Sequence, residues 1–182
     1  MNGRRRLIGS FTHGSMANAL PQAVGAQAAF PDRQVIALAG DGGLSMLLGE
    51  LLTVTQNALP VKTVVYNNDS LNFVELEMKA AGFVNYGTGL DNPDFAAVAE
   101  AVGIRGFRVD RPADLERTVE EFLAHDGPAL LDVVVERQEL TLPPSVKLEQ
   151  AKGFALFAIR TVLSGRGTEL IDLAKANMRQ LL

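Results

Sequence analysis

The chain has 182 residues, of which 47% are hydrophobic, and a formal net charge of -4, which favours one folded globular domain and argues against general nucleic-acid binding. It contains no cysteine, so disulfides, thiolate metal sites and cysteine nucleophiles are excluded. No run of about 18 uninterrupted apolar residues occurs, and no membrane-spanning segment is predicted.

The predicted helices and strands alternate along the chain. Residues with helical spacing or helix-favouring composition predict helices at 16–30, 44–55, 93–102 and 112–123. A short apolar run rich in strand formers predicts a strand at 34–39, and further strands are predicted at 61–66, 104–109 and 129–135. Residues 67–71 are expected to form a loop, and Asn92 is expected to cap the helix at 93–102, which ends before Gly103. This alternation predicts an α/β fold with a doubly wound, mostly parallel sheet and helices on both faces.

A change of composition at 141–144 predicts a domain over 1–140 and a C-terminal helical tail over 141–182. In this tail the apolar segment 153–163 is followed by an apolar stripe with helical spacing. The stripe consists of Leu170, Leu173, Ala174, Met178 and Leu181. By pattern alone, helices docked on the body or on another subunit are favoured over lipid binding.

Polar residues follow two of the predicted strands at their carboxyl ends. Asp41 lies in a Gly-Asp-Gly-Gly motif after the first strand, and Asn67 and Asn68 follow the second, with 24 residues between Gly42 and Asn67. A right-handed crossover of this length is expected to bring Asp41 and Asn68 close together. Their oxygen atoms are ligands that Mg²⁺ prefers when phosphates also hold it. An ordinary turn and a cap are the alternative, but the pair of motifs favours a metal-diphosphate site.

Two further features of the first motif suit a diphosphate. Gly42 and Gly43 lack Cβ atoms, so the backbone can approach a phosphate closely. A helix expected to begin near Leu44 would direct its positive dipole end at the same charge.

These residues resemble a known family. "GDGGLSM" and the later "NN", with 24 residues between Gly42 and Asn67, resemble the diphosphate- and Mg²⁺-binding motif of thiamine diphosphate enzymes. "GSFTHGSMANALPQAVGAQAAFPDRQVIALAGDGG", "VELEMKAAGF" and "PPSVKLEQAKGFALFAIRTVLSGRGTELIDLAKAN" resemble the C-terminal third of bacterial pyruvate:quinone oxidoreductases, also called pyruvate dehydrogenase (quinone) or pyruvate oxidase. The resemblance implies the thiamine diphosphate-binding fold.

The resemblance also implies roles for individual residues. Asp41 and Asn68 would bind Mg²⁺ through their side chains and Ser70 through its main-chain carbonyl. The implied cofactor-binding positions are Gly14, Ser15, Met16, Asp41, Gly42, Gly43, Asn68, Asp69, Ser70, Leu71, Asn72, Phe73 and Val74.

Three of these positions carry particular roles by resemblance. Met16 would bend the cofactor beneath its thiazolium ring, and the Gly14 carbonyl would accept a hydrogen bond from the 4'-amino group; without the resemblance, Met16 reads as a core residue. Phe73 would enter the active site on activation and assist electron transfer to flavin, whereas its pattern alone indicates ordinary packing.

For the whole enzyme, the resemblance implies oxidation of pyruvate to acetate and CO2, with electrons passing through FAD to quinone. It implies a homotetramer in the cytoplasm, held at the inner face of the bacterial cell membrane by lipid contacts of residues 145–182. The pyrimidine-binding and FAD domains are not in this sequence, so the chain is expected to hold half a site and to be inactive alone.

Two alternatives stay open. The chain could be a non-catalytic module that binds lipid or a partner subunit, with a vestigial cofactor motif. It could also belong to an acetolactate synthase-like carboligase, because those enzymes share the two motifs, although the tail argues against this.

Overall fold

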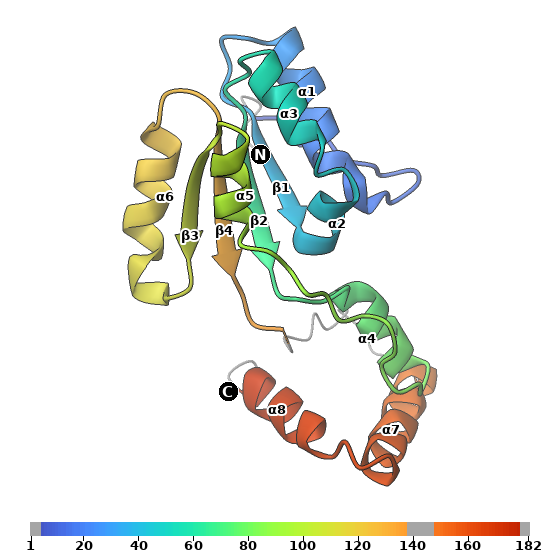
Figure 1. Ribbon diagram of the computed structural model, residues 1–182. Helices are drawn as coiled ribbons and strands as arrows, with labels where there is room; N and C mark the ends of the chain where they lie inside the picture. The colour runs from blue at the N-terminus through green and yellow to red at the C-terminus, as the bar shows by residue number, and fades with distance from the viewer. Residues whose placement is uncertain (1–4, 138–147, 179–182) are drawn as a thin grey trace. The chain divides into compact units, whose positions relative to one another are not determined.

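The computed structural model describes residues 5–137 and 148–178 (Figure 1). The chain forms two compact units. The first, here called the sheet unit, comprises Met1–Asn67 and Asp91–Val135, and the second, the helical unit, comprises Asn68–Leu90 and Glu136–Leu182.

The sheet unit is built on four parallel strands in the order β1-β2-β4-β3. These strands are β1 Ile36–Gly40, β2 Lys62–Asn67, β3 Arg105–Val109 and β4 Ala129–Val134. Their registers place Gly40 opposite Tyr66 and Asn67 opposite Val134, so β1 and β2 end side by side. The sequence predictions of four strands and a parallel sheet are confirmed.

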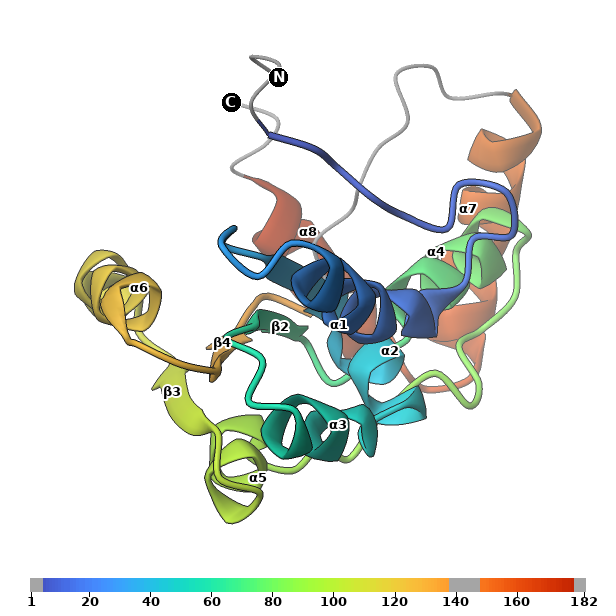
Figure 2. The ribbon, with the colours of Figure 1, turned by 90° about the horizontal axis from the view of Figure 1, so that it is seen from above.

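Helices cover both faces of this sheet, as predicted. The helical segments of the sheet unit are the 3₁₀ turn Met16–Asn18, α1 Ala19–Ala29, α2 Asp41–Met46, α3 Glu50–Gln56, α5 Phe95–Ala101, the 3₁₀ turn Pro112–Asp114 and α6 Leu115–Ala124. Figure 2 shows α3 and α5 on one side of the sheet and α6 on the other. Pro21 lies in the first turn of α1, where its missing N–H costs no hydrogen bond.

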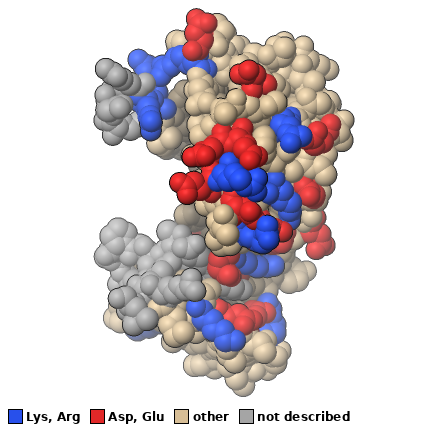
Figure 3. All heavy atoms as spheres, turned by 90° about the vertical axis from the view of Figure 1, so that its left-hand side faces the viewer, with Lys and Arg blue, Asp and Glu red and all other residues tan. Residues whose placement is uncertain are grey.

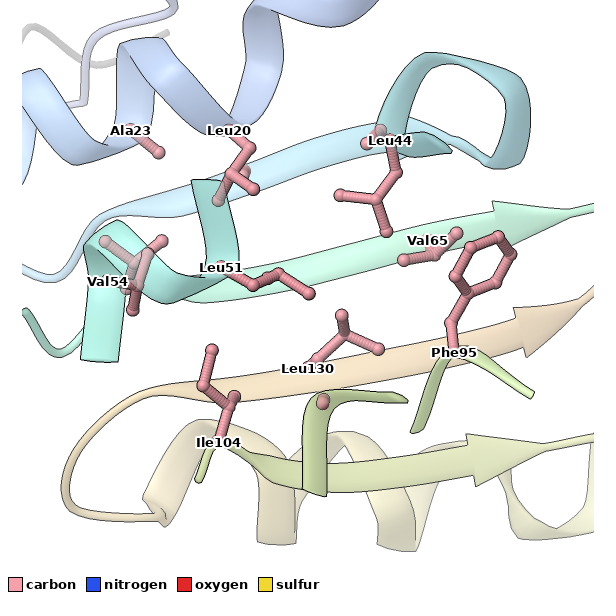
Figure 4. Packing of buried hydrophobic residues seen from close by; sticks show 13 residues of the cluster. Leu20, Ala23, Leu44, Leu51, Val54, Val65, Phe95, Ile104 and Leu130 are labelled. Carbon is pink, nitrogen blue, oxygen red and sulfur yellow. The ribbon is translucent and has the colours of Figure 1, made fainter. Parts of the chain in front are cut away.

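Two apolar clusters form the core on the two faces. The larger cluster joins α1, α3 and α5 to the sheet (Figure 4). Its buried members are Leu20, Ala23, Ala37, Ala39, Leu44, Leu51, Val54, Val61, Val65, Phe95, Ala99, Ile104 and Leu130. The smaller cluster packs Phe122 of α6 against Val109, Ala129 and Leu131. Alternate residues of β4 therefore serve opposite faces, as the period of a strand requires.

Acidic and basic side chains intermingle on the face of the molecule shown in Figure 3. Near the start of α6, Asp114 pairs with Arg111 at 2.6 Å and with Arg117 at 3.4 Å. Arg117 also reaches Glu121 at 3.1 Å, one turn further along the helix. These charges compensate one another locally.

The predicted continuous helix at 44–55 is wrong. The structure has α2 and α3 instead, and α2 begins at Asp41, directly after β1. The break lies at Leu47, where φ is -131° and ψ is 41°, and Glu50 N donates to Leu47 O over three residues at 3.0 Å. Gly49 adds backbone freedom at the break, which weakens a continuous helix.

The predicted cap of the helix at 93–102 is also wrong. Asp94 is the N-cap residue of α5, and its Oδ1 accepts from Ala97 N at 2.9 Å. Gly103 follows the helix with a φ of +83°, as expected for a residue that ends a helix. Asn92 therefore does not cap α5, and its side chain is available for other hydrogen bonds.

The helical unit contains α4 Asn72–Ala80, α7 Leu148–Leu163 and α8 Thr168–Asn177. Helices in the tail were predicted, but α4 was not. On α4 the buried residues are Glu75 and Lys79, whereas Phe73 is 72% exposed. A helix that buries a polar face lacks the apolar periodicity on which the sequence prediction depends.

Helix α7 packs closely on α4. A Cβ atom at Gly153 would lie 1.8 Å from the main-chain oxygen of Ala80, so glycine permits this approach. Arg160 donates to the Gly82 carbonyl at 2.7 Å, and Phe157 of α7 is buried. The tail therefore has a docking surface within its own unit.

The predicted apolar stripe of the tail is only partly covered. Leu173 is buried, whereas Ala174 and Met178 are exposed, and Leu181 lies outside the described residues, as does the predicted boundary at 141–144. Within the described parts of the chain, no helix combines the length and apolar character needed to cross a membrane.

Candidate functional site

Asp41 lies where β1 gives way to α2, at the carboxyl end of the strand. Its side chain is 3% exposed, and its Oδ1 accepts from Gly42 N at 2.8 Å. Its main-chain oxygen accepts from Ser45 Oγ at 2.8 Å, which adds a hydrogen bond to the short helix. The carboxylate is thus fixed against the first turn of α2.

Asn92 joins the ends of β1 and β2. Its Nδ2 donates to Asp41 Oδ2 at 2.8 Å and to Asn67 Oδ1 at 2.9 Å. The sequence pattern predicts Asn92 as a helix cap and gives it no place in the site. Residues 91–94 are four successive capping or turn residues, and only Asp94 is needed to cap α5. This surplus was the one sequence feature that could have indicated another role for Asn92.

A second buried carboxylate, Asp132 of β4, extends this network. Its Oδ1 accepts from Asn67 Nδ2 at 3.1 Å, its Oδ2 accepts from Phe95 N at 3.2 Å, and Arg108 forms an ion pair with it. Burial raises the pKa of Asp132, against the lowering effects of the Asn67 hydrogen bond and the Arg108 charge. The amide of Asn67 is held from both sides, by Asn92 and by Asp132.

The glycine motif contacts the segment before α1. A Cβ atom at Gly43 would lie 2.5 Å from the main-chain oxygen of Met16, so these backbones meet only because residue 43 is glycine. Met16 is exposed, as are Gly14 and Ser15, and Gly14 has a φ of +61°. Met16 is therefore not a core residue, and the structure brings it together with Gly43.

Asn68, Asp69 and Ser70 begin the helical unit. Asn68 Oδ1 accepts from Ser70 N at 3.1 Å, and Asp69 has a φ of +53°, which is uncommon for a residue with a side chain. Asn68 and Asp41 belong to different units, so their proximity stays a prediction.

The same loop is tied to the segment that precedes α5. Ser70 pairs with Gly89 in an antiparallel bridge, for which Leu71 N donates to Thr88 O at 2.8 Å and Leu90 N donates to Asp69 O at 2.9 Å. Neither of these bonds uses the carbonyl of Ser70, the group assigned to the metal.

Glu75 lies beneath this loop with a 1% exposed side chain. Burial alone would raise its pKa, but the hydrogen bond and charge of Lys79, the Ser70 hydroxyl and the charge of Arg137 together hold the pKa below its usual value. This buried carboxylate is therefore ionised at neutral pH. No sequence pattern predicted a role for Glu75.

The remaining predicted residues lie at the start of α4. Leu71 is its N-cap residue and Asn72 is its first residue, and both are partly buried. Phe73 and Val74 are exposed, which is consistent with contact to a ligand or a partner but does not by itself assign one.

The donor types of the predicted ligand set are ones that Mg²⁺ accepts when a phosphate also holds it. Among the described residues, no group of three His, Cys, Asp or Glu side chains is placed to hold a metal ion. One buried carboxylate at Asp41, together with an amide and a carbonyl oxygen, would supply only part of a coordination shell. Mg²⁺ accepts such an incomplete protein shell when a bound phosphate completes it.

Comparisons with known proteins point in the same direction. The family described as "Thiamine pyrophosphate enzyme, C-terminal TPP binding domain" matches residues 1–133. A Bacillus subtilis (strain 168) protein described as "Putative thiamine pyrophosphate-containing protein YdaP" is 35% identical over 179 residues, which cover 98% of this chain and 31% of that protein.

Acetolactate synthases are also similar. The mitochondrial catalytic subunit of Saccharomyces cerevisiae is 37% identical over 131 residues, which cover 71% of this chain and 19% of that protein. The isozyme 2 large subunit of Escherichia coli (strain K12) is 38% identical over 132 residues, which cover 71% of this chain and 24% of that protein. The chain thus spans between about a fifth and a third of the length of these relatives.

Proposed function

Because the chain belongs to the family of C-terminal thiamine pyrophosphate-binding domains of thiamine pyrophosphate enzymes, we propose that it binds Mg²⁺ and the diphosphate of this cofactor at the carboxyl ends of β1 and β2. The observation that carries the proposal is the link from Asp41 through Asn92 to Asn67. It places a buried carboxylate and the first asparagine of the second motif at one edge of the sheet.

In this proposal, the side chains of Asp41 and Asn68 and the main-chain carbonyl of Ser70 hold Mg²⁺, while Gly42 and Gly43 lie against the diphosphate. The proposed cofactor contacts also include Gly14 and Met16, and the main-chain contact of Met16 with Gly43 supports the place of Met16 in the site. When bound, thiamine pyrophosphate supplies a thiazolium carbon that attacks a keto carbonyl. The residues of this chain bind and orient it, and a pyrimidine-binding domain is the proposed partner.

For the whole enzyme, the first candidate activity is acetolactate synthesis from pyruvate. The named relatives in Saccharomyces cerevisiae and Escherichia coli support it. The second candidate is a pyruvate:quinone oxidoreductase that contains FAD, forms homo-oligomers and contacts lipid through residues 145–182. It rests on the likeness of the tail to those enzymes. The Bacillus subtilis relative matches 98% of the chain, tail included, and its description names thiamine pyrophosphate but neither activity.

The cofactor proposal is tested by calorimetric titration of the full chain with thiamine pyrophosphate, with and without Mg²⁺, and with a pyrimidine-binding domain added. Binding should require Mg²⁺ and should be abolished by Asp41→Ala. Asp32→Ala is the matched control, because Asp32 is an exposed carboxylate in a turn, and it should bind as the wild type does. Binding that is absent in the wild type, or that survives Asp41→Ala, would refute the proposal.

The two activities are separated by their products. An enzyme that contains this chain should form acetolactate from pyruvate under the first candidate, and acetate with concurrent quinone reduction under the second. Flotation with anionic liposomes adds a test of the second candidate, since association should depend on residues 145–182 and not on Asp41. An intact tail that never floats would remove the lipid contact.

A further inference from the structure

We infer that Glu75 is a positioning residue that fixes the main chain at Ser70 for the metal. This inference rests on the proposed function, because that proposal assigns the Ser70 carbonyl to Mg²⁺. Glu75 acts through Ser70 and does not itself contact the ion. All the contacts that support this role lie within the helical unit.

The Glu75 carboxylate has hydrogen-bond partners on both oxygens. Oε2 accepts from Ser70 Oγ at 2.9 Å and from Thr88 Oγ1 at 3.3 Å. Oε1 accepts from Lys79 Nζ at 2.7 Å and from Asn85 Nδ2 at 2.8 Å. A carboxylate with this many donors has little freedom to rotate, so it fixes the side chains that it contacts.

Two of these partners lie on the two segments of the antiparallel bridge. Ser70 belongs to one segment, and Thr88 precedes Gly89 on the other. Glu75 therefore fastens both segments from below, in addition to the main-chain bonds at Leu71 and Leu90. The Ser70 carbonyl is left outside those main-chain bonds, in a segment fixed by its side chain and its neighbours.

Helix α4 is oriented so that this network, and not its aromatic residue, occupies the buried face. Packing alone would bury Phe73 and expose a charged pair, yet Phe73 is 72% exposed and Glu75 and Lys79 are 1% and 3% exposed. A buried ion pair is weak evidence for stability, because desolvation offsets much of its attraction. In this unit, the Glu75–Lys79 ion pair instead serves to hold the Ser70 loop in a defined position.

The first test needs no cofactor. Amide hydrogen exchange is measured on the full chain. The exchange rates of the Leu71 and Leu90 amides should rise about tenfold or more in Ser70→Ala and in the double variant Glu75→Gln/Lys79→Met. The double variant also removes Lys79, so that no buried ammonium is left without its carboxylate. Glu149→Gln, an exposed carboxylate of α7, is the matched control and should leave these rates unchanged. Unchanged rates in both Glu75 and Ser70 variants would overturn the inference.

The second test measures the Mg²⁺ concentration that half-saturates thiamine pyrophosphate binding. Mutation of a residue that orients a metal ligand typically lowers metal affinity by about 10–100-fold. Glu75→Gln and Ser70→Ala should therefore each raise the half-saturating Mg²⁺ concentration by about tenfold. Because Glu75→Gln and Ser70→Ala both alter the same Ser70–Glu75 contact, a chain that carries both substitutions should resemble either single variant. Full additivity, or an unchanged concentration in Glu75→Gln, would overturn the inference.

The two proposals fail in different ways. A wild-type chain with no Mg²⁺-dependent binding refutes the proposed function, and the metal role of Glu75 with it. A wild type that binds normally, alongside a Glu75→Gln variant that also binds normally, refutes only the role of Glu75.

Discussion

Asn92 Nδ2 lies 2.8 Å from Asp41 Oδ2 although the two residues are 51 positions apart along the chain. The same nitrogen reaches Asn67 at 2.9 Å, so one amide connects the ends of two neighbouring strands. A side chain that resembles a helix cap in the sequence thereby holds the candidate metal ligand.

Replacing Asn92 with alanine should lower the free energy of unfolding by about 1–3 kcal/mol, because two buried acceptors lose their donor. It should also weaken Mg²⁺-dependent cofactor binding. Urea unfolding and calorimetric titration measure the two effects. Asn57→Ala, which removes an exposed amide hydrogen bond to Thr53 O, is the control and should cost less than about 0.5 kcal/mol. Equal losses in the two variants would contradict this account.

Gly43→Ala should destabilise the sheet unit by about 1–3 kcal/mol, because the added methyl group would meet the Met16 carbonyl oxygen at 2.5 Å. Thermal unfolding measures the change. Gly49→Ala is the matched control, since no atom lies within 4 Å of its Cβ position and its φ is -60°. That variant should be neutral or slightly stabilised. A Gly43→Ala chain as stable as the wild type would show that the two backbones can separate freely.

Asp132 should make stability depend on pH in a defined direction. Burial raises its folded-state pKa above the reference value of 3.8. A raised folded-state pKa gives a contribution to stability that is fully present below the unfolded-state pKa and is lost as pH rises through the folded-state pKa. The stability of the wild type relative to Asp132→Asn should therefore increase as pH falls from 7 towards about 4.

Urea unfolding at several pH values measures this difference. Asp32→Asn, at an exposed position, should show no such trend relative to the wild type. Parallel pH profiles for the wild type and Asp132→Asn would mean that the Arg108 and Asn67 contacts cancel the effect of burial.

Gly153→Ala should separate α7 from α4, because its Cβ would lie 1.8 Å from the Ala80 oxygen, a distance that main chain cannot accommodate without moving. Amide exchange in α7 should rise by about tenfold or more. The control is Gly167→Ala, whose nearest neighbour would be a flexible Val162 methyl group at 4.0 Å. Unchanged protection of α7 in Gly153→Ala would show that its docking does not depend on this approach.

Much of the sheet unit followed from sequence pattern. Runs such as Val61–Tyr66 are rich in β-branched residues and bounded by turns, which is typical of buried parallel strands. The helix α4 did not follow, because its covered face carries Glu75 and Lys79 rather than apolar residues. Its orientation depends on partners distant in sequence, such as Thr88 and Arg137, which no local pattern contains.

The candidate site was predictable to a similar extent. Asp41 was singled out because a carboxylate in a glycine-rich motif after a parallel strand lies at the edge of the sheet where ligands bind and can hold a metal ion. Asn92 was missed because capping preference is a local signal, and the choice between Asn92 and Asp94 depends on where Asp41 and Asn67 lie. Glu75 was missed for the same reason.

The junction between β1 and α2 contains no connecting residue, since the strand ends at Gly40 and the helix begins at Asp41. Insertions and deletions usually accumulate in loops, where extra length is absorbed by solvent-exposed backbone. Here a single inserted residue would have to enter the strand or the helix and would turn the carboxylate away from Asn92. This part of the molecule can therefore diverge by substitution but not by change of length.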